Sequence, residues 1–220
     1  MCELRKSPRT PLPRWHRGRL LLSGLLLLVL VWQWGSAFAI EAKAQLAQVL
    51  IERAWQQKLD APELDVAPWP WADTQPVGRL QWLDASGRVR KDLYVLGGGH
   101  GEALAFGPGL LQVGAASQPG ARVIGGHRDT HFAFLQQLKS GEVLRWQASD
   151  GQWRRYVISQ RSIADAAQGD LWVNPDADSL WLVTCYPFDA VRAGGSLRYV
   201  VRADSVPAAA GFAHNRRFTL

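Results

Sequence analysis

Three residue types that can together transfer an acyl group lie at the ends of strand-like runs in this sequence, or within them. Cys185 ends the run SLWLVTC, His127 follows ARVIGG, and Arg198 lies in LRYVVRA. A thiolate can attack a carbonyl, an imidazole can relay the proton, and a fixed cation can stabilise the charge that grows on the carbonyl oxygen. Arginine suits the last task because it stays charged and presents several donors. These residues together suit thiol-based acyl transfer.

The same residues also have a structural interpretation. A buried cysteine that acts as a small hydrophobic residue is common, and a histidine on another strand can meet it by chance. Spacing alone leaves both interpretations open. Arg202 is a rival for the arginine role, because strand side chains repeat every two residues and Arg202 therefore shares a face with Arg198. Thr184 should point to the face opposite Cys185.

The segment HRDTH could also be interpreted as a metal cluster, since His127, Asp129 and His131 alternate in it. No second cluster of ligands accompanies it in the sequence, so we expect no metal. The run Gly97–Gly99 fits a turn better than a phosphate cradle, because no helix or Lys-Ser/Thr signature follows it. We therefore expect no cofactor.

The N-terminal part of the chain has the composition of a membrane anchor. Residues 1–19 are basic, and residues 20–40 contain no charged side chain. A helix of that length reaches roughly 30 Å, the thickness of a bilayer core. Trp32 and Trp34 lie near its end, where indoles favour the interface. Positive charge before this segment predicts a single pass through the inner (cytoplasmic) membrane, with the N-terminus inside and the catalytic part periplasmic or otherwise extracytoplasmic.

A cleaved signal peptide is the alternative to an anchor. Leu20–Val31 could be its apolar region, and Ala37-Phe38-Ala39 fits the cleavage pattern. We favour a retained anchor because the uncharged run is long enough to span a bilayer. Both possibilities export the same domain and leave Cys185 as an unpaired thiol in an oxidising compartment, since Cys2 precedes the apolar segment.

The charge distribution argues against nucleic acid as a partner. The formal net charge is +6 at pH 7. Six basic residues against Glu3 in residues 1–19 supply +5 of this charge, which leaves +1 for the rest of the chain. The folded part therefore lacks the basic excess of a nucleic-acid-binding domain.

Two connecting segments follow the apolar one. Residues 41–61 have apolar side chains at helical spacing and predict an amphipathic juxtamembrane helix. Residues 62–78 contain prolines that exclude a regular helix or a central strand, so we expect a linker there. Trp69 and Trp71 could clamp this linker onto the domain or lie at the membrane surface.

Residues 79–205 consist mostly of strand-like runs and turn signals. EVLRWQAS and QWRRYVISQR flank Asp150-Gly151, which predicts a hairpin because tight primed turns need positive φ. HFAFLQQLKSG predicts a short helix closed by Gly141. Many short strands with few helices predict an all-β fold, either a small closed barrel or a sandwich. We expect a partly loose tail over residues 206–220.

Three blocks of the sequence resemble the active-site blocks of the sortases, which are cysteine transpeptidases. They are VIGGHRDTHFAFLQQLKSGE, LWLVTCYPF and LRYVV, and ALAFGPGLL resembles the segment before the histidine strand of that family. The resemblance spans roughly residues 79–203. The layout of anchor, PWPWADT linker and barrel is similar to the single sortases of Gram-negative bacteria. This resemblance implies an eight-stranded closed β-barrel.

The resemblance also implies a role for each candidate residue. Cys185 would form a thioester with the substrate, His127 would be its acid/base partner, and Arg198 would be the oxyanion or substrate-positioning group. Thr184 matches a family position close to the active site, so the resemblance makes it a candidate substrate-binding residue. The implied partner is an exported target protein with a C-terminal LPXTG-like sorting motif, whose acyl group passes to an amine that the sequence does not identify.

Two other functions fit the same scaffold. A cysteine peptidase or hydrolase would use the same three residues and resolve the acyl-enzyme with water. A non-catalytic module would bind a peptide segment without reaction, and the combination of Cys185, His127 and Arg198 argues against this function.

Overall fold

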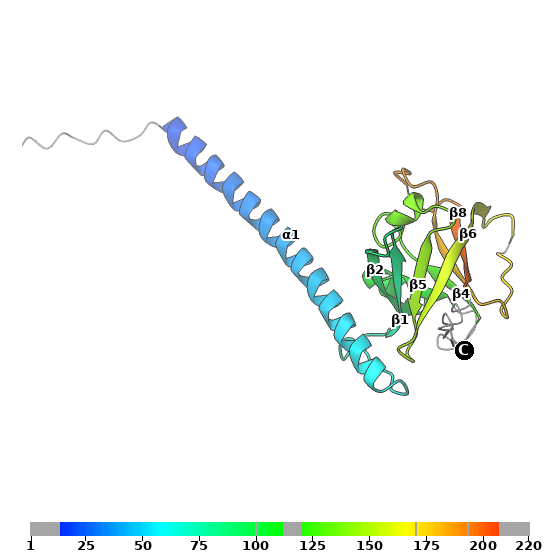
Figure 1. Ribbon diagram of the computed structural model, residues 1–220. Helices are drawn as coiled ribbons and strands as arrows, with labels where there is room; N and C mark the ends of the chain where they lie inside the picture. The colour runs from blue at the N-terminus through cyan, green and yellow to red at the C-terminus, as the bar shows by residue number, and fades with distance from the viewer. Residues whose placement is uncertain (1–13, 100, 112–119, 170, 193, 207–220) are drawn as a thin grey trace, which may run out of the picture. The chain divides into compact units, whose positions relative to one another are not determined.

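The computed structural model describes residues 14–99, 101–111, 120–169, 171–192 and 194–206 (Figure 1). Most of the basic segment predicted over residues 1–19, and all but the first residue of the predicted tail, lie outside the described residues. In chain order the elements are α1 (Arg14–Asp60), β1 (Pro76–Leu83), β2 (Val89–Gly97), α2 (Gly101–Phe106), β3 (Gly109–Leu111), β4 (Ala121–Gly125), the 3₁₀ helix η1 (Ala133–Gln137), β5 (Val143–Gln147), β6 (Trp153–Asp165), β7 (Ser179–Cys185) and β8 (Leu197–Ser205).

The strands form one closed barrel in the order β1-β2-β3-β4-β7-β8-β6-β5. Most neighbouring strands are antiparallel, but β2 pairs with β3, and β4 pairs with β7, in the parallel direction. The barrel confirms the predicted all-β fold and decides between barrel and sandwich. The parallel pairs were not predicted, because the hydrophobic period of a strand does not say which strands become its neighbours.

Alternating side chains fill the barrel interior. In β7, Leu180 and Leu182 are fully buried, whereas Trp181 and Val183 are half-buried on the other face of the strand. Trp146 of β5 belongs to the same buried cluster as these two leucines and is fully buried too. Each such side chain stabilises the fold by about 1.5–3 kcal/mol relative to an exposed one. The packed interior therefore fixes which face of each strand points into the barrel.

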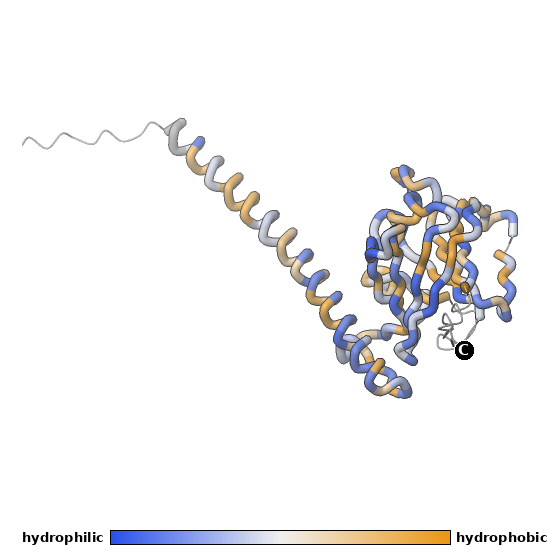
Figure 2. Tube along the Cα trace, in the orientation of Figure 1, coloured by the Kyte–Doolittle hydropathy of each residue, from blue (hydrophilic) through white to orange (hydrophobic). Residues whose placement is uncertain are grey.

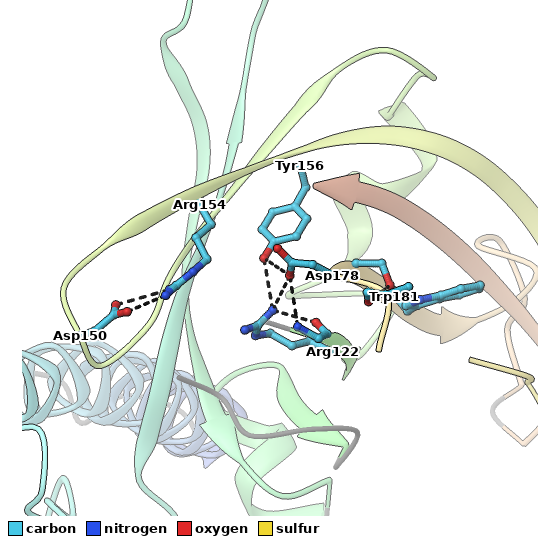
Figure 3. A network of polar contacts seen from close by, with 9 residues as sticks. Arg122, Asp150, Arg154, Tyr156, Asp178 and Trp181 are labelled. Atoms are coloured by element: carbon cyan, nitrogen blue, oxygen red, sulfur yellow. Dashed lines mark hydrogen bonds and ion pairs between the residues drawn. The ribbon is translucent and has the colours of Figure 1, made fainter. Parts of the chain in front are cut away.

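A buried polar network joins the beginnings of β4 and β7 (Figure 3). The Arg122 guanidinium donates to the Tyr156 hydroxyl at 3.2 Å and forms an ion pair with Asp178 at 3.2 Å. The Tyr156 hydroxyl donates to the same carboxylate at 2.9 Å. Burial raises the pKa of Tyr156, and the bond to Asp178 raises it further, so this hydroxyl stays a neutral donor. The network holds the segment before β7 against β4 and β6.

The hairpin predicted at Asp150-Gly151 is confirmed. β5 and β6 pair as antiparallel strands around this turn, and Gly151 has a φ of +75°. The short helix predicted to close at Gly141 is corrected: it is the 3₁₀ helix η1, and it ends at Gln137. Gly141, with a φ of +89°, lies instead in the turn that leads into β5.

The chain divides into two compact units, residues Met1–Leu46 and Ala47–Leu220. In the first unit, α1 carries a run of apolar and exposed side chains, which Figure 2 shows as a stretch of hydrophobic colour. One helical segment, Gly18–Asp60, is long and apolar enough to cross a membrane by length and composition. The second unit contains the barrel together with the last turns of α1.

The last turns of α1 pack against the barrel within the second unit. One stripe of this helix is buried, formed by Ala47, Ile51, Ala54 and Trp55. The Trp55 indole donates to the Gln147 side-chain oxygen at 3.2 Å. The residues share one helix face because they recur every three or four positions. This part of α1 is therefore part of the barrel domain's core.

The linker also contacts the barrel domain. Trp69 packs edge-on against Phe106 of α2, with ring centroids 5.0 Å apart. Trp71 is 82% exposed, so only one of the two tryptophans clamps the linker to the domain. β1 begins at Pro76, within the range predicted as linker. A proline is tolerated there because it is the first residue of the strand.

Candidate active site

The parallel pairing of β4 and β7 brings the ends of these strands together. Gly125 lies opposite Val183 in this pair, and the Gly126 amide donates to the Val183 carbonyl at 3.2 Å beyond the last paired residues. Parallel strands advance together at the same rise per residue, so the next residues also lie side by side. His127 and Cys185 each lie two residues after this last pair, His127 in the loop after β4 and Cys185 at the end of β7. Both are exposed, and the Cys185 thiol is free.

The antiparallel pairing of β7 with β8 adds the arginine. Cys185 and Arg198 are directly opposite each other in this ladder. Residues opposite each other have Cβ atoms about 4.5–5.5 Å apart on the same face of the sheet. One nitrogen of the Arg198 guanidinium, Nη1, donates to the carbonyls of Gly195 at 2.6 Å and Leu197 at 2.9 Å. These two bonds hold the guanidinium at the beginning of β8, the part of the strand that pairs with the end of β7.

Arg202, the other candidate for the arginine role, lies four residues along β8 from Arg198, the residue opposite Cys185. It pairs with Trp181 in the ladder, and its guanidinium carbon lies 5.2 Å from the Trp181 ring centroid. Its Nε donates to the Asp204 carboxylate at 2.9 Å. Both partners keep Arg202 at a distance from the end of β7.

Thr184 points away from the face that carries Cys185, as the strand period predicts. It is 2% exposed, and its hydroxyl donates to the Gly126 carbonyl at 2.7 Å. This bond ties β7 to β4 at the residue that precedes His127.

The loop after β4 is shaped by a close approach between Gly126 and Phe132. A Cβ on Gly126 would lie 2.9 Å from the Phe132 ring, so a larger residue would displace this buried side chain. The His127 carbonyl accepts from the Phe132 amide at 2.9 Å and closes the turn. These contacts explain why the segment GGHRDTHF presents His127 at its surface.

His131 is half-buried behind this turn. Its ring donates to the Ala105 carbonyl of α2. Burial lowers the pKa of His131, and the nearby charges of Lys91 and His127 lower it further. His131 is therefore a neutral side chain at pH 7.

The alternation of His127, Asp129 and His131 does not assemble a metal site in the described part of the chain. No group of three or more His, Cys, Asp or Glu side chains there is arranged to hold a metal ion. The Asp129 carboxylate instead accepts from Arg128 at 2.9 Å.

Arg128 is a residue that the sequence did not single out. It is 8% exposed, and it donates to two carbonyls of the loop that follows Cys185, those of Pro187 and Ala190. An arginine in a polar segment predicts a solvated side chain, because sequence does not reveal that distant carbonyls lie nearby.

Aromatic side chains of the segment after Cys185 pack against an aromatic side chain of β8. The Phe188 and Tyr199 rings meet edge-on with centroids 5.2 Å apart, and the Tyr186 and Tyr199 rings stack at 6.2 Å. A pocket of about 400 Å³ is lined by Tyr186, Pro187, Phe188 and Asp189 together with Gln136 of η1. This pocket lies beside the residues that follow Cys185, and Cys185 itself is not among the residues that line it.

Comparison with known proteins agrees with this arrangement. A family model described as a sortase domain matches residues 87–206. Sortase D of Bacillus subtilis (strain 168) is 29% identical over 82 residues, which are 37% of this chain and 41% of that protein. The match thus spans less than half of that relative's length.

Two solved structures support the fold alone, because their sequence identity is low. The Clostridium perfringens Sortase D5 transpeptidase has a TM-score of 0.54 and 18% identity, and the match covers 74% of this chain and 99% of that one. A lid mutant of sortase A from Corynebacterium diphtheriae has a TM-score of 0.50 and 20% identity, with 74% and 94% covered. Because the sortase family model covers more than half of its residues, the chain belongs to the sortase family of cysteine transpeptidases.

Proposed function

We propose that the protein is a membrane-anchored transpeptidase that cleaves a C-terminal LPXTG-like sorting motif through a thioester on Cys185 and transfers the acyl group to an amine. The observation that carries this proposal is the strand pairing on both sides of β7. In the parallel pair with β4, Gly125 lies opposite Val183, and His127 and Cys185 each follow two residues later. In the antiparallel pair with β8, Cys185 lies opposite Arg198. This pairing supports a site at one edge of the barrel, with the nucleophile from the end of β7, the proton carrier from the loop after β4 and the cation from β8.

In the proposed first half-reaction, the Cys185 thiolate attacks the carbonyl carbon of the motif's threonine. Arg198 stabilises the negative charge on the carbonyl oxygen with donors of its guanidinium. The C–N bond then breaks, and His127 gives a proton to the departing amine. The products are a thioester between Cys185 and the target protein, and a released C-terminal peptide.

In the proposed second half-reaction, an amine attacks the thioester carbon. His127 accepts the proton of the attacking amine, and the carbon–sulfur bond breaks to return the Cys185 thiolate. The target protein is thereby joined to the amine through a new amide bond, with no net oxidation or reduction.

The proposed contribution of Thr184 to substrate binding is indirect. Its buried hydroxyl bonds the Gly126 carbonyl, and this contact supports a role in fixing the backbone beside Cys185. The pocket lined by Tyr186, Phe188 and Asp189 supports a peptide-sized substrate next to the thiol.

The proposed location is the inner (cytoplasmic) membrane, crossed once by α1, with the N-terminus inside and the barrel extracytoplasmic. The apolar helical segment within Gly18–Asp60 supports the anchor. The basic residues before it support the orientation.

The distribution of reaction products tests this function against the two alternatives. The full chain in detergent is incubated with LPXTG-like peptides, with and without hydroxylamine, and the products are identified by mass. A transpeptidase should form the peptide hydroxamate when hydroxylamine is present. The amount of free acid should then fall as the amount of hydroxamate rises. Free acid in equal amount with and without hydroxylamine would support a hydrolase, and bound but unchanged peptide would support a binding module.

A further inference from the structure

Arg128 connects the loop that carries His127 to the loop that follows Cys185. Its Nη1 donates to the Pro187 carbonyl at 2.7 Å, and its Nη2 donates to the Ala190 carbonyl. Its Nε donates to the neighbouring Asp129 carboxylate at 2.9 Å. All three sides of the guanidinium therefore have a partner, and the residue is 8% exposed. The proposed acyl transfer uses none of these contacts directly.

The two carbonyls belong to one turn. The Ala190 amide donates to the Pro187 carbonyl at 3.4 Å, so the residues that Arg128 holds are the two ends of this turn. On its other side, the loop is tied to β8 by the Tyr186 amide, which donates to the Leu197 carbonyl at 3.0 Å. The loop next to Cys185 is thus fixed from β8 and from the His127 loop.

The chemistry of arginine suits this position. A buried cation is costly unless it is paired and hydrogen-bonded, and Asp129 supplies the pairing charge. A planar guanidinium can donate in parallel to two carbonyls, whereas an ammonium is a compact charge on a flexible stem. A side chain without these donors would leave the Pro187 and Ala190 carbonyls without their arginine partner in a part-buried place.

We propose that Arg128 is a positioning residue that fixes the end of β7 and the loop after it relative to His127. The proposal rests on the proposed function, in which the Cys185 thiolate attacks the substrate carbonyl and His127 gives a proton to the departing amine. Arg128 acts on this pair through the backbone, since it is the residue after His127 and holds a turn that begins two residues after Cys185. Catalytic alignment of the two groups thereby depends on a side chain that does not touch the substrate.

A matched control exists at the other end of the same strand pair. Arg122 is also buried, at 1% exposure, and its ion pair with Asp178 joins the beginnings of β4 and β7. Arg122→Gln therefore removes a buried arginine near the beginning of β4, at the end of the strand pair away from Cys185. Arg128→Gln removes the clamp, and Arg128→Lys keeps the charge with a different geometry.

The kinetic test uses the full chain in detergent, with hydroxylamine as acceptor, below the unfolding temperature of every variant. Arg128→Gln should lower kcat about 100-fold with little change in KM, because misalignment by about 1 Å can have this effect. Arg128→Lys should recover part of kcat. Arg122→Gln should lower Tm but leave kcat and KM of the folded enzyme unchanged. Equal kcat in Arg128→Gln and Arg122→Gln would overturn the proposal.

Hydrogen exchange gives a second measurement that needs no substrate. Amides of residues 186–192 should exchange faster in Arg128→Gln than in the natural protein, and at the natural rate in Arg122→Gln. Unchanged exchange in Arg128→Gln would also overturn the proposal. If the natural protein itself forms no acyl-enzyme, the proposed function fails, and the exchange rates alone then decide whether Arg128 holds this loop.

Discussion

The sequence predicts the chemistry of Cys185, His127 and Arg198 but not that they lie next to one another. Their residue types and their places at strand ends indicate the chemistry, but adjacency depends on which strands pair. The parallel register of β4 with β7 and the antiparallel register of β7 with β8 supply this information. Arg128 was missed for the same reason, since its partners are carbonyls about sixty residues away along the chain.

Replacement of Arg198 tests whether the reaction needs the planar guanidinium group with its several donors. We expect Arg198→Lys to lower kcat/KM by about 10²–10³-fold, the usual effect of removing one oxyanion donor. Peptide hydroxamate formation measures this change. Arg202→Lys is the matched control on the same face of β8, because Arg202 contacts Trp181 and Asp204 instead. An equal loss in both variants would indicate a general effect on β8.

His131 should make the stability of the domain depend on pH. Burial lowers its pKa in the folded state, whereas the unfolded state keeps a value of about 6.5. As the pH falls through about 6.5, the unfolded state binds the proton first, so the free energy of unfolding decreases. The contribution of His131 is fully present above this pH and is lost below it.

The variant His131→Gln checks this pH dependence, because glutamine keeps a donor for the Ala105 carbonyl but does not titrate. Urea unfolding at pH 7.5 and 5.5 should show a larger decrease in the free energy of unfolding for the natural protein than for the variant. Identical decreases would contradict the lowered pKa of His131.

At the scale of elements, the last turns of α1 belong to the barrel domain. The helical spacing of their apolar residues could be predicted from the sequence. Trp55 was not identified as buried, because periodicity predicts a buried stripe but not what covers it. The barrel contact includes the bond from Trp55 to Gln147 and the bond from Gln48 to the Phe106 carbonyl at 2.7 Å. A soluble fragment that begins near residue 60 would lack these contacts.

The contribution of this helix is measurable with two tryptophan variants. Trp55→Ala should lower the free energy of unfolding by about 3–5 kcal/mol, because Trp55 is fully buried. Trp71→Ala should change it by less than about 0.5 kcal/mol, because Trp71 is 82% exposed. Urea unfolding of a fragment that begins at residue 45 gives both values. Equal effects would show that α1 does not pack on the barrel in solution.

At the scale of the whole molecule, the apolar part of α1 and the barrel domain have separable roles. The apolar segment can span a bilayer, and the buried stripe of α1 begins after it, at Ala47. Removal of residues 1–44 should therefore release a soluble domain that keeps kcat and KM for a peptide substrate. A fragment that loses activity while it stays folded would indicate that the membrane segment contributes to the site.

The fate of the N-terminal segment separates an anchor from a cleaved signal peptide. We expect the protein in membranes to keep residues 1–40 and to resist extraction at alkaline pH, because the uncharged segment of residues 20–40 is long enough to span. The intact mass of the membrane form measures this directly. A mass that corresponds to cleavage after Ala39, with the protein in the soluble fraction, would contradict the anchor.

The most direct test of the proposed chemistry is the intact mass of the fragment from residue 45, incubated with an LPXTG-like peptide. A thioester on Cys185 predicts an adduct with the mass of the N-terminal part of the peptide, which hydroxylamine removes as the hydroxamate. Cys185→Ala should keep its Tm within a few degrees, because the thiol is exposed, and should form no adduct. An adduct that persists in Cys185→Ala, or peptide cleavage by that variant, would contradict catalysis by Cys185.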